Sequence, residues 1–117
     1  MPFSRLLLAA FWIAAGLNHF RIPRAYQAIM PRSMEIWKHE AVVISGVAEI
    51  AGGVGVLPAA TRRPARWGLL ALLAAIYPAN VQMALNPERY PKIPPAALWA
   101  RLPLQFACAW WVWRATE

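Results

Sequence analysis

The 117-residue sequence is poor in the residues that bind metals and act as nucleophiles. It contains one cysteine, Cys108, two histidines and no aspartate. A single cysteine excludes an internal disulfide and any pair of thiols for thiol exchange. His19 and His39 have no cysteine or carboxylate companions at the spacing of a metal site, so we predict that no metal is bound. The residues inside the long apolar stretches also cannot supply a nucleophilic triad of the kind found in soluble hydrolases.

Charged residues are scarce as well, at 15% of the chain against about 25% in soluble domains. Hydrophobic residues make up 60%. The net charge of +7 comes from lysines and arginines that are spread between the apolar stretches. A nucleic-acid-binding protein would carry them along one exposed face, so we exclude a nucleic-acid partner. The composition instead indicates an integral membrane protein surrounded by a lipid bilayer.

Four apolar stretches run through the chain, each close to the length of about 20 residues that a helix needs to cross a bilayer. They cover residues 3–20, 41–60, 67–86 and 96–113. We therefore predict one domain over residues 1–117, an all-α integral membrane four-helix bundle with up-down topology and short loops. Within the first stretch, Arg5 followed by an apolar run also fits a signal peptide, whose cleavage would leave three spans.

Prolines mark the connections between these stretches. Pro58 and Pro64 predict a tight helical hairpin, with Thr61 as the N-cap of the helix that follows. In the longest connection, helical spacing is shown by Ile22, Ala25, Tyr26 and Ile29, in a segment bounded by Pro23 and Pro31. They fit a short amphipathic helix in the headgroup region of the membrane, and they fit an irregular polar loop equally well.

The strongly polar residues within the stretches fall in one half of the predicted membrane. In an up-down bundle, the ends of the first and third stretches share a membrane face with the starts of the second and fourth. The residues concerned are Asn18, His19, Glu49, Asn80, Arg101 and Gln105. Polar side chains in lipid face the bundle interior, so we expect one polar pocket to which all four helices contribute. Arg101 is the expected ion-pair partner of Glu49.

Three further patterns bear on this pocket. Pro78, inside the third stretch, is expected to free the carbonyl near Ala74 and to open space beside the polar residues. The small residues of the second stretch are expected to let neighbouring helices pack closely. Trp12 is expected to belong to the core, whereas the other six tryptophans lie near span ends and are typical of an interfacial belt.

Five segments follow one another along the chain: GLNHFRIPRAYQAIMP, VISGVAEIAGGVGVLP, TRRPARWGLLALL, YPANVQMAL and RLPLQ. Together they resemble the DoxX-like family of small bacterial membrane proteins, over nearly the whole chain. The resemblance implies a four-helix membrane fold. Some members of that family are small subunits of quinone-linked oxidoreductases, such as thiosulfate:quinone oxidoreductase, and others are associated with redox and thiol stress or with resistance to quinones and catechols. The resemblance carries onto His19, Pro23, Tyr26, Pro31, Ser45, Gly46, Glu49, Pro78, Asn80, Arg101, Pro103 and Gln105.

We expect from these patterns a pocket that binds a quinone-like or redox-active small molecule, in a membrane oxidoreductase system or in defence against quinone or redox stress. The predicted pocket residues are His19, Tyr26, Ser45, Glu49, Asn80, Arg101 and Gln105. No catalytic residue is assigned and no cofactor ligand is evident, and a quinone is the candidate cofactor. Two alternatives stay open: a non-catalytic membrane subunit or scaffold whose ion pair is structural, and a small transporter or channel subunit.

The expected location is the bacterial cytoplasmic (inner) membrane. We predict a multi-pass protein with both termini in the cytoplasm, because the short connection around residues 61–66 holds the densest group of basic residues. The expected protein partners are an oxidoreductase or further copies of the same chain.

Overall fold

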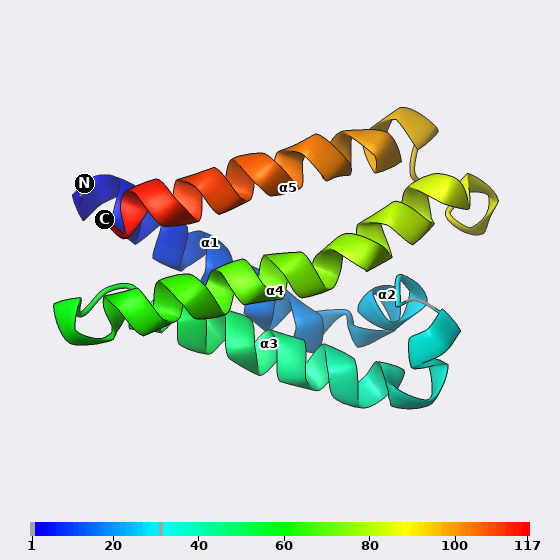
Figure 1. Cartoon of the computed structure of the whole chain (residues 1–117). Coiled ribbons are helices and arrows are strands. Elements are labelled where there is room, and N and C mark those ends of the chain that lie inside the picture. The colour runs from blue at the N-terminus through cyan, green and yellow to red at the C-terminus, as the bar shows by residue number, and fades with distance from the viewer. Residues whose placement is uncertain (1, 31) are drawn as a thin grey trace.

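The computed structural model describes residues 2–30 and 32–117, and these residues are helical almost throughout. The four long helices are α1 (Pro2–Arg21), α3 (Lys38–Gly55), α4 (Ala59–Leu85) and α5 (Pro95–Ala115). The shorter elements are α2 (Pro23–Ala28) and the 3₁₀ helices η1 (Arg32–Trp37) and η2 (Pro87–Arg89). The long helices run alternately up and down, so that both termini lie at one end of the molecule and α2 lies at the other (Figure 1). The all-α prediction is confirmed.

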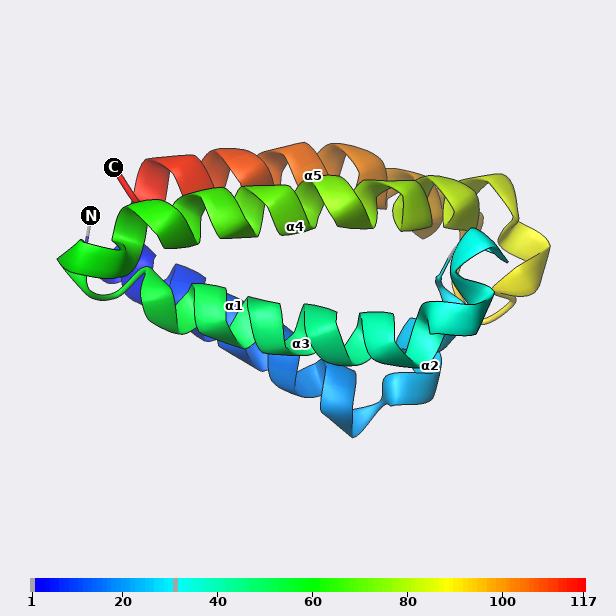
Figure 2. The same ribbon diagram turned by 60° about the horizontal axis from the view of Figure 1, so that its bottom comes forward.

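The long helices form two pairs, α1 with α3 and α4 with α5, which lie against each other as two layers (Figure 2). The contact between α1 and α3 is the most extensive, and glycines make it close. A Cβ atom added to Gly16 would lie 2.7 Å from the carbonyl oxygen of Gly46, and one added to Gly53 would lie 3.0 Å from that of Ala9. The expected role of small residues in close helix packing is therefore found here.

The turn between α3 and α4 is held by side chains that hydrogen-bond to the last carbonyl of α3 and to the two carbonyls that follow it. Thr61 Oγ1 donates to the carbonyl oxygen of Gly55 at 2.6 Å, and the Arg62 guanidinium donates to the next two carbonyls at 2.9 and 2.7 Å. The last carbonyls of a helix have no partner within the helix, and basic side chains stabilise them. The prediction that Thr61 caps the start of α4 is wrong, because α4 begins at Ala59 and Thr61 serves the end of α3.

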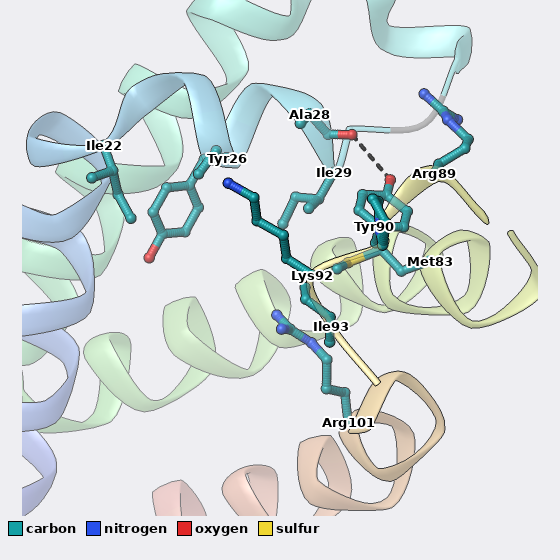
Figure 3. A pocket seen from close by; sticks show the side chains of 12 residues that line it. Ile22, Tyr26, Ala28, Ile29, Met83, Arg89, Tyr90, Lys92, Ile93 and Arg101 are labelled. Atoms are coloured by element: carbon teal, nitrogen blue, oxygen red, sulfur yellow. Dashed lines mark hydrogen bonds between the residues drawn. The ribbon is translucent and has the colours of Figure 1, made fainter. Parts of the chain in front are cut away.

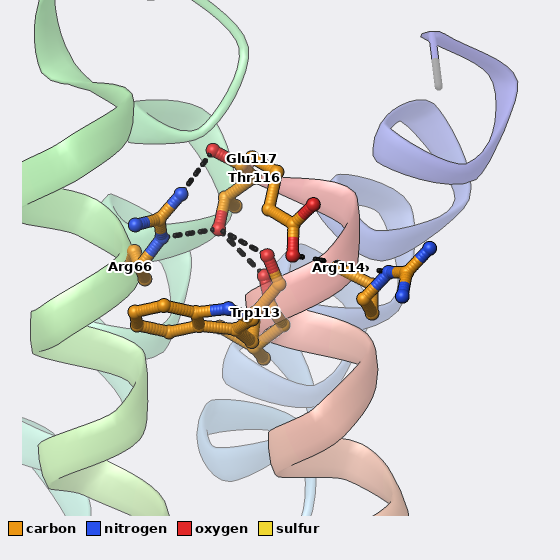
Figure 4. A network of polar contacts seen from close by, with 6 residues as sticks. Arg66, Trp113, Arg114, Thr116 and Glu117 are labelled. Carbon is orange, nitrogen blue, oxygen red and sulfur yellow. Dashed lines mark hydrogen bonds and ion pairs between the residues drawn. The ribbon is translucent and has the colours of Figure 1, made fainter.

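A similar network closes the end of the molecule where the termini lie (Figure 4). Arg66 Nε donates to Thr116 Oγ1 at 2.8 Å, and Arg66 Nη2 donates to the carbonyl oxygen of Thr116 at 2.6 Å. The same guanidinium lies 4.4 Å from the centre of the Trp113 ring. Arg5 Nε donates to the carbonyl oxygen of Ala115 at 3.0 Å. The end of α5 is thereby joined to both α1 and α4.

At the opposite end, the segment that the sequence predicted as either a short amphipathic helix or an irregular polar loop forms the helix α2. Tyr90 Oη donates to the carbonyl oxygen of Ala28 at 3.0 Å. Gln82 Nε2 lies 3.0 Å from the carbonyl oxygen of Ile29 and 2.6 Å from Tyr90 Oη, and it donates to both. These bonds fix α2 against α4 and the loop before α5, so the irregular-loop alternative is wrong. Pro31, expected to bound the helix, lies outside the described residues.

The prediction of four membrane-spanning helices is also wrong. In the part of the chain that the structure describes, only α1, over Phe3–Arg21, and α4, over Ala59–Leu85, are long and apolar enough to cross a membrane. Three charged residues lie within the 18 residues of α3, and α5 contains two arginines and a glutamine. The described residues pack into a globule with a radius of gyration of 14.5 Å, close to the value of about 13 Å expected for a domain of this length.

The surface of this globule is rich in large apolar side chains. Phe3 on α1, Ile44 on α3 and Phe106 on α5 are 73%, 67% and 64% exposed, and Trp67 and Leu85 are exposed on α4. Soluble monomers rarely expose apolar patches larger than a few hundred Å². Such faces are typical of a protein that is covered by lipid or by another chain.

Buried apolar side chains form two separate clusters, which lie towards opposite ends of the bundle. The first includes Leu8, Ala9, Trp12, Val56, Leu69, Leu73, Val112 and Ala115. The second consists of Met83, Ala84, Tyr90 and Leu98. The polar residues predicted to form a pocket belong to neither cluster.

Candidate ligand-binding cavity

A cavity of about 700 Å³ lies between the two helix pairs. Its volume falls within the range of about 300–1,000 Å³ that is usual for small-molecule sites. The four long helices and α2 all contribute to its wall, which is mostly apolar. The seven predicted pocket residues all line it: His19, Tyr26, Ser45, Glu49, Asn80, Arg101 and Gln105. Pro78 lines it too. That these residues bind a ligand stays a prediction.

Helix periodicity explains why these residues converge. Positions three, four or seven residues apart lie on the same side of a helix, and each long helix presents one such face to the cavity. The faces are Trp12, Ala15 and His19 on α1, Ala41, Ser45 and Glu49 on α3, Leu73, Ile76 and Asn80 on α4, and Arg101, Gln105 and Cys108 on α5. The acid and the imidazole thus come from one helix pair, and the amides and the guanidinium come from the other.

His19 and Glu49 form a buried pair that must share a proton. His19 Nε2 lies 2.9 Å from Glu49 Oε2, and the two side chains are only 7% and 4% exposed. His19 Nδ1 lies 2.8 Å from the carbonyl oxygen of Ala15, so this nitrogen carries a hydrogen. Nε2 is then an acceptor unless the ring is cationic. A proton therefore lies between the side chains, on the ring or on the carboxyl group. Without it, Glu49 Oε2 would be a buried oxygen with no donor among the described residues.

Tyr26 of α2 covers the imidazole. The rings of Tyr26 and His19 are stacked, with centroids 3.9 Å apart and an interplanar angle of 21°. Asn18 Nδ2 donates to Tyr26 Oη over 3.4 Å. Because α2 is itself fixed by Tyr90 and Gln82, this stack holds the His19 ring in one orientation at the wall of the cavity.

On the opposite wall, the amides form a chain of hydrogen bonds. Asn80 Nδ2 donates to Gln105 Oε1 at 2.6 Å, and Gln105 Nε2 donates to the carbonyl oxygen of Leu73. Pro78 lies inside α4 and has no N–H, so it cannot bond the carbonyl of Ala74. The carbonyl of Leu73, which accepts from Gln105, is the neighbour of this unbonded carbonyl. Each amide uses one of its two N–H hydrogens in this chain of bonds, so one N–H hydrogen of each has no acceptor among the described residues.

Arg101 does not form the predicted ion pair with Glu49. Its Nε donates to Asn80 Oδ1 at 3.3 Å, and the residue is exposed at the edge of the cavity. The reason is the packing order of the helices. α3 packs against α1 and α4, whereas α5 packs against α4 and α1. Glu49 therefore meets a side chain of its close neighbour α1, and the long side chain of Arg101 extends towards solvent.

Trp12 is a residue of the cavity wall that the sequence assigned to the core alone. It is 3% exposed and belongs to the first apolar cluster, but it also lines the cavity. Its Nε1–H has no acceptor among the described residues. A buried indole N–H normally finds a partner, because leaving it unpaired costs about 1–3 kcal/mol. The signal in the sequence was its position seven residues before His19, on the same helix face.

Comparison with known proteins gives a family but no activity. The sequence profile of a domain of unknown function, DUF8561, matches residues 8–116. The chain belongs to this family. No curated protein and no solved structure matches it.

Proposed function

We propose that this DUF8561 protein is a bacterial membrane protein whose 700 Å³ cavity binds a quinone-like or otherwise redox-active small molecule. It would do so within a membrane oxidoreductase system or in defence against quinone or redox stress. The observation that carries the proposal is the combination, in one largely apolar cavity, of the proton-sharing His19–Glu49 pair and the unpaired Trp12 N–H donor.

The chemistry of a quinone fits this combination. A quinone has an apolar ring with two carbonyl oxygens that accept hydrogen bonds, and both oxygens take up protons when the ring is reduced. An unpaired buried donor such as Trp12 Nε1 offers a bond to one carbonyl oxygen. The His19–Glu49 pair supplies a proton next to the cavity, as a general acid does. Arg101, at the edge, has further N–H groups for a second oxygen. The electrons would come from a partner oxidoreductase.

The membrane location is supported by α1 and α4, which are long and apolar enough to cross a bilayer, and by the exposed apolar side chains on the long helices. In this proposal the cytoplasmic (inner) membrane holds the protein as a multi-pass protein with both termini in the cytoplasm. Arg62, Arg63 and Arg66 would then lie on the cytoplasmic side at the start of α4. The resemblance to the DoxX-like family supports the same location and the same ligand class.

The test is a calorimetric titration of the purified full chain, in neutral detergent, with a short-chain benzoquinone. We expect binding of one molecule per chain, and we expect Glu49→Gln to weaken it because the shared proton is lost. Glu40→Gln is the matched control: Glu40 lies on the same helix, is exposed and does not line the cavity. No binding by the native chain, or equal binding by both variants, would refute the proposal.

A second candidate is a non-catalytic subunit in which the ion pair only locks the bundle. It is favoured by one observation, that His19 and Glu49 join the two helices with the most extensive contact. A variant with leucine at both positions separates the candidates. If the pair is structural, the double variant recovers part of the stability that Glu49→Leu loses and still binds whatever the native chain binds. If the pair is part of the ligand site, the double variant keeps much of its stability but loses quinone binding.

A further inference from the structure

A second, smaller cavity of about 420 Å³ lies at the end of the molecule formed by α2 and the loop between α4 and α5 (Figure 3). Its walls are largely apolar, with Ile22 and Ile29 from the α2 region, Met83 from α4 and Ile93 from the loop. It shares Tyr26, Ile29 and Arg101 with the larger cavity, so the two cavities adjoin.

The walls of this cavity are well fixed. The Tyr90 hydroxyl, which donates to Ala28 and accepts from Gln82, joins α2, α4 and the loop around it. Tyr90 and Met83 also belong to the second buried cluster. The cavity is therefore a built part of the fold, with three elements held at its sides.

Its charge is entirely of one sign. Three basic residues line it, Arg89, Lys92 and Arg101, and no acidic residue does so. Arg89 and Arg101 each donate one bond to a neutral amide, at 3.3 Å in both cases, and Lys92 has no hydrogen-bond or ion-pair partner among the described residues. Lys92 and Arg101 extend towards the part of the cavity beside Tyr26, whereas Arg89 lies on the far side next to Tyr90 (Figure 3).

We propose that this cavity binds the phosphate headgroup of an anionic phospholipid. Lys92 and Arg101 would hold the phosphate oxygens, and the isoleucines would contact the first carbons of the acyl chains. Three cations without a carboxylate select an anion, and the apolar walls favour one that carries a hydrocarbon tail over a free ion. Lys92 distinguishes this site from the proposed quinone site, because it lines the smaller cavity but not the larger one.

The test measures lipid binding to the purified full chain by native mass spectrometry in neutral detergent. The probes are phosphatidylglycerol, phosphatidylcholine with the same acyl chains, and inorganic phosphate. We expect phosphatidylglycerol to bind more tightly than phosphatidylcholine, and Lys92→Gln to weaken phosphatidylglycerol binding about fivefold, the loss expected for one basic residue near anionic lipid. Lys92→Arg, which keeps the charge, should bind as the native chain does.

Lys38→Gln is the matched control. It removes the same charge from the start of α3, outside the cavity, and should leave lipid binding unchanged. Equal binding of the two lipids, or equal loss in Lys92→Gln and Lys38→Gln, overturns the proposal. Displacement of phosphatidylglycerol by millimolar inorganic phosphate overturns the lipid assignment in favour of a free anion. The benzoquinone titration of Lys92→Gln should match that of the native chain, so failure of either proposal is recognised independently of the other.

Discussion

The two ends of the bundle use the same residue type in different ways. At the end with the termini, Arg5, Arg62 and Arg66 donate to carbonyl oxygens at helix ends, and Arg66 also covers Trp113. At the end with α2, Arg101 bonds weakly to an amide and lines both cavities. Basic side chains thus close one end by satisfying the backbone, whereas at the other end they keep donors free. The difference indicates that the terminal end stabilises the fold and that the α2 end holds the candidate sites.

The largest effect on stability is expected at the buried His19–Glu49 pair, which lies between the two ends. Glu49→Leu leaves His19 buried without its partner, and we expect it to lower the free energy of unfolding by about 3 kcal/mol, the lower limit for breaking a buried pair. The variant with leucine at both positions should recover part of this loss, because no orphaned polar group remains. Chemical unfolding of the native chain, Glu49→Leu, His19→Leu and the double variant in detergent gives the coupling energy. Strictly additive losses would mean that the pair does not interact.

A smaller loss is expected from steric conflict between α1 and α3. In Gly16→Ala the new Cβ would lie 2.6 Å from Ile50 Cγ1 and 2.7 Å from a backbone oxygen, and the backbone cannot move aside easily. We expect a loss of about 2 kcal/mol in the free energy of unfolding. Gly68→Ala is the control, since its Cβ would meet nothing within 4 Å and alanine favours a helix. Equal behaviour of the two variants would contradict the close packing of α1 against α3.

The direct comparison of the two ends is between Arg66→Met and Arg101→Met. Arg66 makes two hydrogen bonds to Thr116 and a cation–π contact, so its loss should cost about 1 kcal/mol of unfolding free energy. Arg101 is exposed and makes one long hydrogen bond, so its loss should cost less than about 0.5 kcal/mol. Thermal unfolding in the same detergent ranks the two. A larger loss for Arg101 would contradict the conclusion that the end with the termini is the one that stabilises the fold.

Much of this arrangement follows from the sequence, because apolar stretches and helix periodicity are local properties. The all-α fold, the helical hairpin after Gly55 and the convergence of His19, Glu49, Asn80, Arg101 and Gln105 on one cavity were predictable from spacing, whereas Tyr26 and Ser45 came from the family resemblance. The number of membrane spans was not predictable, because Glu49 in α3 and Arg101 and Gln105 in α5 interrupt apolar runs that otherwise have the length of a span.

The partner of Glu49 could not be derived from the sequence either. His19 and Arg101 lie at depths along their helices from which either could reach Glu49. Only the order in which the helices pack decides which of the two pairs with it. Similarly, the role of Thr61 depends on where α3 ends, which composition does not fix. Trp12 was recognised as buried, but an unpaired N–H is visible only once every neighbouring acceptor has been placed.

In the proposed function, the larger cavity binds a carbonyl-bearing redox molecule through the indole N–H of Trp12, which has no acceptor among the described residues. The most direct measurement is the dissociation constant of a short-chain benzoquinone for Trp12→Phe, with Trp99→Phe as the control, since Trp99 is exposed and lines neither cavity. Loss of one hydrogen bond, worth about 1 kcal/mol, should raise the dissociation constant of Trp12→Phe about fivefold and leave that of Trp99→Phe unchanged. Binding that is equally strong in both variants, or absent from the native chain, would contradict the claim.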